Sequence, residues 1–186
     1  MSINSPAMSL SKATECVSRL DLDPIRFKLV HNDEGAKWPL DRANNVENQY
    51  RAYLALTLMF PTVSLVPSGD IDAFWHQHIL DTEKYAQDCD AVFGTFLHHF
   101  PYFGIRSDAD AKSLEQAFSA TKQLFEEHFD LDITRSTDCT SGTCGTACGQ
   151  KCSDPRNVLQ ATLRPGMTIS GSTYLKHSGL ENGTIQ

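Results

Sequence analysis

The chain has 186 residues, of which 40% are hydrophobic and 21% are charged, and its formal net charge is −7. This length allows one domain with a substantial core and excludes two large ones. The acidic balance argues against nucleic acid or an anionic membrane surface as the main partner.

The sequence predicts an all-α protein in two parts: a compact domain of about five helices over residues 1–129, and a largely irregular tail over residues 130–186 that is rich in Gly, Ser, Thr and Cys. Apolar residues recur at helical spacing in the first part. The tail has too few apolar side chains to build a core alone. The expected helices cover residues 9–20, 23–31, 39–60, 71–93 and 109–128.

Compartment and partners follow from what the chain lacks. It has no run of about 18 apolar residues, so we expect no membrane span. Its N-terminal segment has no signal-peptide layout, and we therefore expect a cytoplasmic protein. Thiols stay reduced there, so the six cysteines are expected to be free thiols or metal ligands rather than disulfides. A protein partner and the oligomeric state are left open.

The segment from Asp72 to Gly104 is the best candidate for a functional site. It holds four of the seven histidines together with many aromatic residues. An imidazole-rich site suits a transition metal, with Zn or Fe the first expectation. The candidate ligands are Asp72, His76, His78, His98 and His99.

Helical geometry separates the two histidines of the Trp-His-x-His motif. At about 100° per residue, His76 and His78 point roughly 200° apart on one helix. Asp72 and His76, four residues apart, share a face, with Glu83 two turns further on. His78 lies on the apolar face with Tyr85 and Cys89. One shared site would need a loop histidine to fold back, or an irregular helix. Because neighbours in an extended loop point apart, only one of His98 and His99 is expected to face any one site.

Less specific interpretations apply to the same residues. Asp72 and His76 could form an ordinary hydrogen-bonded pair, and His78 could be a satisfied core histidine. Cys89 is expected to act as a small buried hydrophobe. The aromatics of residues 93–103 are expected to be packing anchors.

The runs WHQHILDTEKYAQDC and FGTFLHHFPYFG resemble the glycine-rich-domain-containing-protein-like family in its short bacterial form. Members carry a Trp-His-x-His motif, then a Tyr and an Asp-Cys pair, and finally a Gly and a closing His. The resemblance covers roughly residues 50–129. It implies little about activity, and the RNA link of plant members belongs to other regions, so it implies no nucleic-acid partner here.

A second candidate metal site lies in the tail, where four cysteines are separated by four, three and three residues: Cys139, Cys144, Cys148 and Cys152. Four thiolates are enough for a tetrahedral zinc site or an iron–sulfur cluster. A disulfide or redox-active thiol cluster, and a flexible tail with incidental or modified cysteines, are the alternatives.

These observations favour a metal-binding helical protein. An open metal position would activate water or oxygen, and the protein would then be a metalloenzyme. One alternative is a non-enzymatic interaction module that docks through the aromatic loop 93–103. Another is a thiol-based redox or metal-trafficking protein that acts through the tail. No phosphate loop, dinucleotide fingerprint or nucleophile elbow is present.

Overall fold

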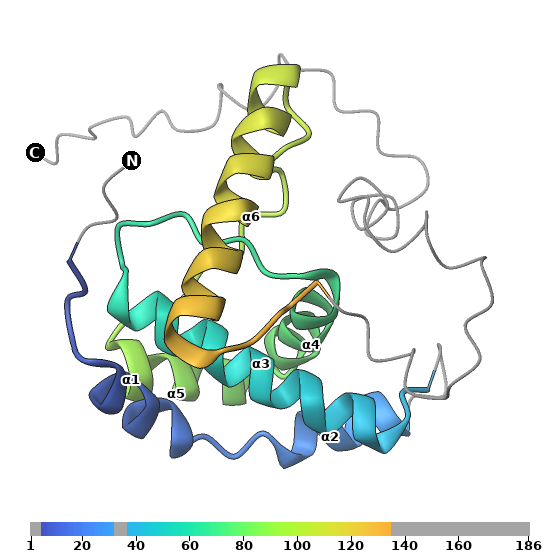
Figure 1. Ribbon diagram of the computed structural model, residues 1–186. Coiled ribbons are helices and arrows are strands. Elements are labelled where there is room, and N and C mark those ends of the chain that lie inside the picture. The colour runs from blue at the N-terminus through green and yellow to red at the C-terminus, as the bar shows by residue number, and fades with distance from the viewer. Residues whose placement is uncertain (1–4, 32–36, 135–186) are drawn as a thin grey trace, which may run out of the picture. The chain divides into compact units, whose positions relative to one another are not determined.

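The computed structural model describes residues 5–31 and 37–134, and this part of the chain forms helices without any strand (Figure 1). The six helices are α1 (Leu10–Ser18), α2 (Asp23–Val30), α3 (Leu40–Met59), α4 (Gly69–Leu80), α5 (Thr82–Phe93) and α6 (Asp108–Phe129). The all-α prediction is thus confirmed for the domain. The tail from residue 135 onward lies outside the described residues. Within the described ranges, no helix combines the length and the apolar character that a membrane crossing requires.

Helix α3 is the centre of the packing, because α1, α2, α4 and α6 all contact it. Its buried side chains become nearly continuous toward its C-terminal end, and they include Val46, Tyr50, Tyr53, Leu54 and Leu56. A helix that is apolar on most of its circumference must be covered on most sides. The helices around α3 supply that cover, and α4 is one of them.

The prediction of one continuous helix over residues 71–93 is wrong. Asp81 has φ −84° and ψ 73°, which is outside the helical region and separates α4 from α5. Two hydrogen bonds then join residues ten positions apart: Trp75 Nε1–H to the Tyr85 hydroxyl at 2.9 Å, and His78 Nε2 to Asp88 Oδ2 at 2.9 Å. In a straight helix, residues ten apart are separated by about 15 Å along the axis. The break therefore folds α5 back toward α4.

The loop between α5 and α6 is fixed at both ends. Gly94 ends α5 in the left-handed conformation, with φ 67°, which glycine adopts readily after a helix C-terminus. At the other end, Asp110 accepts hydrogen bonds from the backbone N–H groups of Gly104 and Arg106. The hydrogen bond from the Arg106 guanidinium, with these backbone bonds, lowers the pKa of Asp110 to about 2. The loop that carries His98 and His99 is thus held between two helices.

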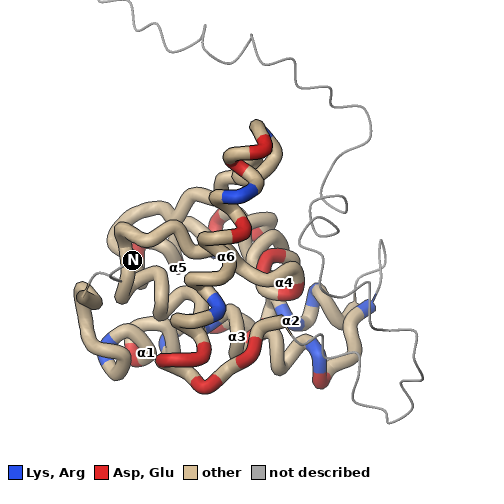
Figure 2. Tube along the Cα trace, turned by 45° about the horizontal axis from the view of Figure 1, so that its top comes forward, with Lys and Arg blue, Asp and Glu red and all other residues tan. Residues whose placement is uncertain are grey.

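A buried carboxylate ties the N-terminal helices to α3. Figure 2 shows acidic residues interspersed with basic ones along the helices. Among the acidic residues, Glu47 is buried. It accepts hydrogen bonds from Arg26 of α2 at 2.8 Å and from Arg51 at 2.8 Å. Arg51 also donates to the carbonyl oxygens of Val17 and Leu20. One carboxylate therefore holds two cations that bridge α1, α2 and α3.

We predict that Glu47→Ala destabilises the protein by about 2–3 kcal/mol, because it leaves the partly buried Arg51 without a carboxylate and Arg26 with only the exposed Asp23. The exposed Glu15, which also pairs with two cations, Lys12 and Arg19, is the matched control. Glu15→Ala should change stability little, since exposed pairs contribute little. Urea denaturation of the three proteins measures both effects. Equal losses of unfolding free energy in the two variants would contradict the claim that the buried Glu47 stabilises the fold more than the exposed Glu15 does.

Candidate metal centre

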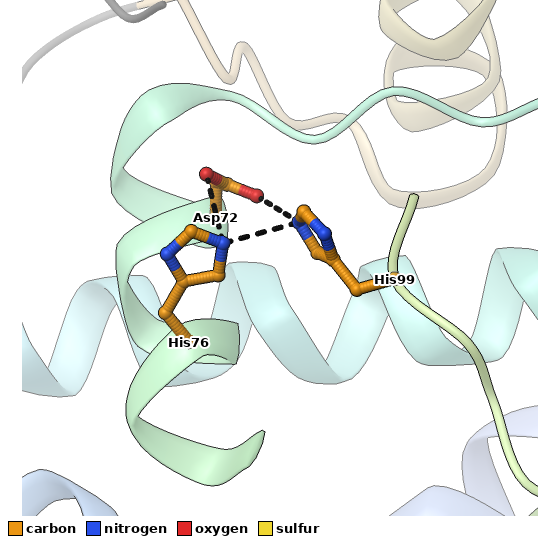
Figure 3. Close-up of side chains that lie close together, drawn as sticks. All are labelled: Asp72, His76 and His99. Atoms are coloured by element: carbon orange, nitrogen blue, oxygen red, sulfur yellow. Dashed lines mark hydrogen bonds and ion pairs between the residues drawn. The ribbon is translucent and has the colours of Figure 1, made fainter. Parts of the chain in front are cut away.

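Three side chains converge at the side of α4: Asp72, His76 and His99 (Figure 3). His99 Nε2 lies 2.9 Å from Asp72 Oδ1 and 3.1 Å from His76 Nε2. His76 Nε2 lies 3.6 Å from Asp72 Oδ2. Each carboxylate oxygen thus faces one imidazole, and the two imidazoles face each other. Within the described part of the chain, this is the one group of three His, Cys, Asp or Glu side chains whose ligand-type atoms all lie within 4.8 Å of one another.

The protonation chemistry of this group limits what it can do by hydrogen bonding alone. An ionised carboxylate only accepts hydrogen bonds, and an imidazole Nε2 either carries one hydrogen or offers one lone pair. When two Nε2 atoms face each other, at most one of them donates to the other. One proton on His99 would have to serve both Asp72 and His76. Without protons, the two Nε2 atoms and one oxygen of Asp72 offer three lone-pair donors within 4.8 Å of one another, which is what a cation requires.

The geometry of α4 and of the loop explains how the three side chains meet. Asp72 and His76 are four residues apart on α4, so they share one face, as the sequence predicts. Ser68 caps this helix by accepting a hydrogen bond from the Ile71 N–H. His99 comes from the loop between α5 and α6, and its ring meets the Trp75 ring with centroids 4.7 Å apart. The folded-back loop histidine that a shared site requires is therefore His99.

His78 occupies a separate, buried environment, and only 1% of its surface is exposed. Its Nδ1 lies 3.0 Å from the Tyr50 hydroxyl, and its Nε2 lies 2.9 Å from Asp88. Burial lowers the pKa of His78, although Asp88 acts in the opposite direction. Burial also raises the pKa of Tyr50 well above its ordinary value. Tyr50 therefore donates to Nδ1, and a neutral His78 donates from Nε2 to Asp88.

Both ring nitrogens of His78 are thus satisfied inside the core, and the structure does not bring this residue to the cluster around Asp72. The divergence of His76 and His78 matches the expected helical geometry. Sequence reasoning missed the partners Tyr50 and Asp88. Asp88 lies beyond the break at Asp81, and Tyr50 belongs to another helix, so periodicity within one helix could not identify either.

The other candidate residues lie elsewhere. His98 is exposed, and its ring packs against Phe96. Glu83 is exposed in the first turn of α5, so, contrary to the prediction, it does not continue the helix that carries Asp72 and His76. Cys89 is buried beside Tyr85, as expected for a small hydrophobe. The tail cysteines Cys139, Cys144, Cys148 and Cys152 lie outside the described residues.

The aromatic loop 93–103 is divided between surface and interior. Phe96 and Phe100 are 45% and 55% exposed. Tyr102 and Phe103 are half-buried, as is His99. The loop therefore presents some apolar surface while its remaining aromatics pack inward.

The fold and the site together define an all-helical protein with a histidine–carboxylate cluster. The family described as UCP032817-like matches residues 15–130, more than half of the chain, and the chain belongs to this family. No curated protein and no solved structure matches the chain. Family membership by itself assigns no activity, and the resemblance to the glycine-rich-domain-containing-protein-like family stays a prediction.

The buried position of His78 predicts a pH-dependent stability. A histidine whose pKa is lowered by folding binds its proton more readily in the unfolded state. The contribution of His78 to the free energy of unfolding is therefore fully present above about pH 6.5, the ordinary histidine pKa. This contribution is lost as the pH falls below that value. In His78→Gln the amide can still bond Tyr50 and Asp88 but does not titrate. We expect its free energy of unfolding to fall less than that of the wild type between pH 7.5 and pH 5.5.

Chemical denaturation at the two pH values, in the presence of a chelator, measures this difference. His98→Gln is the matched control, because His98 is exposed, and it should keep the wild-type pH dependence. A His78→Gln protein with the full wild-type loss at pH 5.5 would contradict a buried neutral His78.

Proposed function

We propose that the protein binds a transition-metal ion, with Zn or Fe as the first candidates, through Asp72, His76 and His99. The observation that carries the proposal is the convergence of two imidazole Nε2 atoms and one carboxylate within 4.8 Å. Imidazole and carboxylate ligands suit Zn and Fe. His78 and His98 are left out of the ligand set, because His78 is satisfied in the core and His98 points to the surface side of the loop.

The distances support this ligand set. Bonds of about 2.0–2.1 Å to a four-coordinate ion place tetrahedral ligand atoms about 3.3–3.4 Å apart. The His76 and His99 Nε2 atoms lie 3.1 Å apart, Asp72 Oδ1 lies 2.9 Å from His99 Nε2, and Asp72 Oδ2 lies 3.6 Å from His76 Nε2. Each separation is within about 0.5 Å of the tetrahedral value, so small side-chain rotations would suffice to bring both nitrogens and one carboxylate oxygen around an ion. The site is also partly accessible, with side-chain exposures of 34% for His76, 17% for Asp72 and 19% for His99.

A metal ion held by three protein ligands keeps a coordination position open, so it can do chemistry as well as stabilise the fold. Closed structural zinc sites use four protein ligands, whereas catalytic sites use three and keep a position for water. Two histidines and one carboxylate with open positions are also typical of non-haem Fe(II) sites that activate oxygen. A bound ion would supply Lewis-acid or oxygen chemistry, and we propose a metalloenzyme on this basis. Asp72 would balance the charge of the ion, and the two imidazoles would fix its position.

The exposed Phe96 and Phe100 support a second candidate function, docking of a protein partner on the loop 93–103. This function does not exclude the metal site, since His99 stabilises the same loop from its inner side. A third candidate, thiol-based redox or metal trafficking through the tail, depends on residues outside the described part of the chain.

Metal binding at the cluster is tested on the full chain with Cys139, Cys144, Cys148 and Cys152 replaced by Ser, so that the tail thiols cannot contribute. We expect one equivalent of Zn²⁺ or Co²⁺ to bind, and binding to raise the Tm. His76→Ala and His99→Ala should each weaken binding by about 100-fold or more, because two ligands hold the ion less well than three.

His98→Ala is the matched control for His99→Ala, since the two residues are neighbours in one loop but only His99 faces the cluster. The starting protein for these variants is the full chain with the four tail cysteines replaced by Ser. His98→Ala should bind metal as tightly as this starting protein. Isothermal titration calorimetry measures all four proteins. An unliganded starting protein, or equal losses in His98→Ala and His99→Ala, would contradict the proposed site.

The tail cysteines make a separate prediction. If they hold an ion, the chain with all six cysteines should bind one more equivalent of Zn²⁺ than the chain with the four tail cysteines replaced by Ser. Metal content measured after dialysis of both proteins decides this. Equal content would contradict a tail metal site and leave the site at Asp72 unaffected.

A further inference from the structure

The hydroxyl group of Tyr85 lies between α4 and the loop that carries His99. It accepts a hydrogen bond from Trp75 Nε1–H at 2.9 Å and donates one to the Leu97 carbonyl oxygen at 2.5 Å. Burial raises the pKa of Tyr85 above its ordinary value, so the hydroxyl keeps its proton and can donate. Trp75 and Tyr85 are themselves buried. Both hydrogen bonds are therefore shielded from water, which would otherwise compete for the same groups.

Each partner of Tyr85 is adjacent to the metal-site residues. Trp75 precedes His76 on α4, and its ring contacts the His99 ring with centroids 4.7 Å apart. Leu97 is two residues before His99 in the loop. A single hydroxyl thus fixes the loop backbone relative to the helix that supplies Asp72 and His76. The loop has no regular secondary structure around His99 to do this instead.

We propose that Tyr85 is the positioning residue of the metal site: its hydroxyl holds the loop at Leu97 so that His99 reaches the ion as the third ligand. The inference rests on the proposed function, because it concerns the same site. Groups that orient metal ligands without touching the ion typically change metal affinity by about 10- to 100-fold when they are replaced. Tyr85 touches neither the ion position nor a ligand atom, so its effect must act through the loop.

The test uses Tyr85→Phe in the full chain with the four tail cysteines replaced by Ser. Co²⁺ is the probe, since its visible absorption reports the number and type of its ligands. We expect Tyr85→Phe to bind Co²⁺ about 10- to 100-fold more weakly than the starting protein. The spectrum at saturation should shift toward that of His99→Ala, because His99 is the ligand that is released.

Thr121→Val is the matched control for a general loss of stability. Like Tyr85, the buried Thr121 accepts one hydrogen bond, from the Val66 N–H, and donates one, to the Ala117 carbonyl oxygen, each at 2.9 Å. It joins α6 to the segment before α4 and has no bond to the loop around His99. Its Co²⁺ affinity and spectrum should stay those of the starting protein, although its Tm falls.

The outcomes separate the two proposals. A starting protein that binds no Co²⁺ overturns the metal site and this inference with it. A starting protein that binds Co²⁺, with unchanged affinity and spectrum in Tyr85→Phe, overturns the role of Tyr85 alone. If Tyr85→Phe does not fold, Trp75→Phe decides, because it removes the bond that joins the Tyr85 hydroxyl to α4 while it keeps an aromatic ring. Its Co²⁺ affinity should fall below that of Thr121→Val, and an affinity and spectrum equal to those of Thr121→Val would overturn the role of Tyr85.

Discussion

The break between α4 and α5 at Asp81 is the feature on which the rest of the site depends. It allows Trp75 to bond Tyr85, and His78 to bond Asp88, across ten positions of the chain. A continuous helix would separate these pairs by about 15 Å along its axis. Because α5 folds back, the loop that follows it passes beside α4, and His99 can approach Asp72 and His76. The histidine–carboxylate cluster is therefore a consequence of the bend.

The two histidines of the Trp-His-x-His motif then have opposite environments. His76 lies at the partly exposed side of α4 with Asp72, where an ion and water could reach it. His78 lies in the core, neutral, with a hydrogen bond at each ring nitrogen. The cost of burying an imidazole is offset there by Tyr50 and Asp88, which satisfy both of its polar atoms. The Trp-His-x-His motif thus supplies a candidate metal ligand, His76, and a buried residue, His78, whose hydrogen bonds join α3, α4 and α5.

The sequence alone predicts the helical class, the shared face of Asp72 and His76, and the divergence of His76 from His78. All of these follow from local periodicity. It could not choose between His98 and His99, because that choice depends on the path of the loop after Gly94, which periodicity within a helix does not determine. It also missed the break, for which the only local signal is the pair Asp81-Thr82, two residues that favour caps over helix interiors. Because of the break, Glu83 does not continue the helix face of Asp72 and His76 that the sequence predicts, and the partners Tyr50 and Asp88 could not be found.

The most direct test of this account is to observe the side-chain nitrogens of the individual histidines by ¹⁵N NMR during a Zn²⁺ titration, with the tail cysteines replaced by Ser. The account predicts that the Nε2 signals of His76 and His99 shift on binding, because these atoms coordinate the ion. The signals of His98 should not move, and His78 should stay neutral with its proton on Nε2. Coordination shifts at His78 or His98, or no shift at His76 and His99, would contradict it.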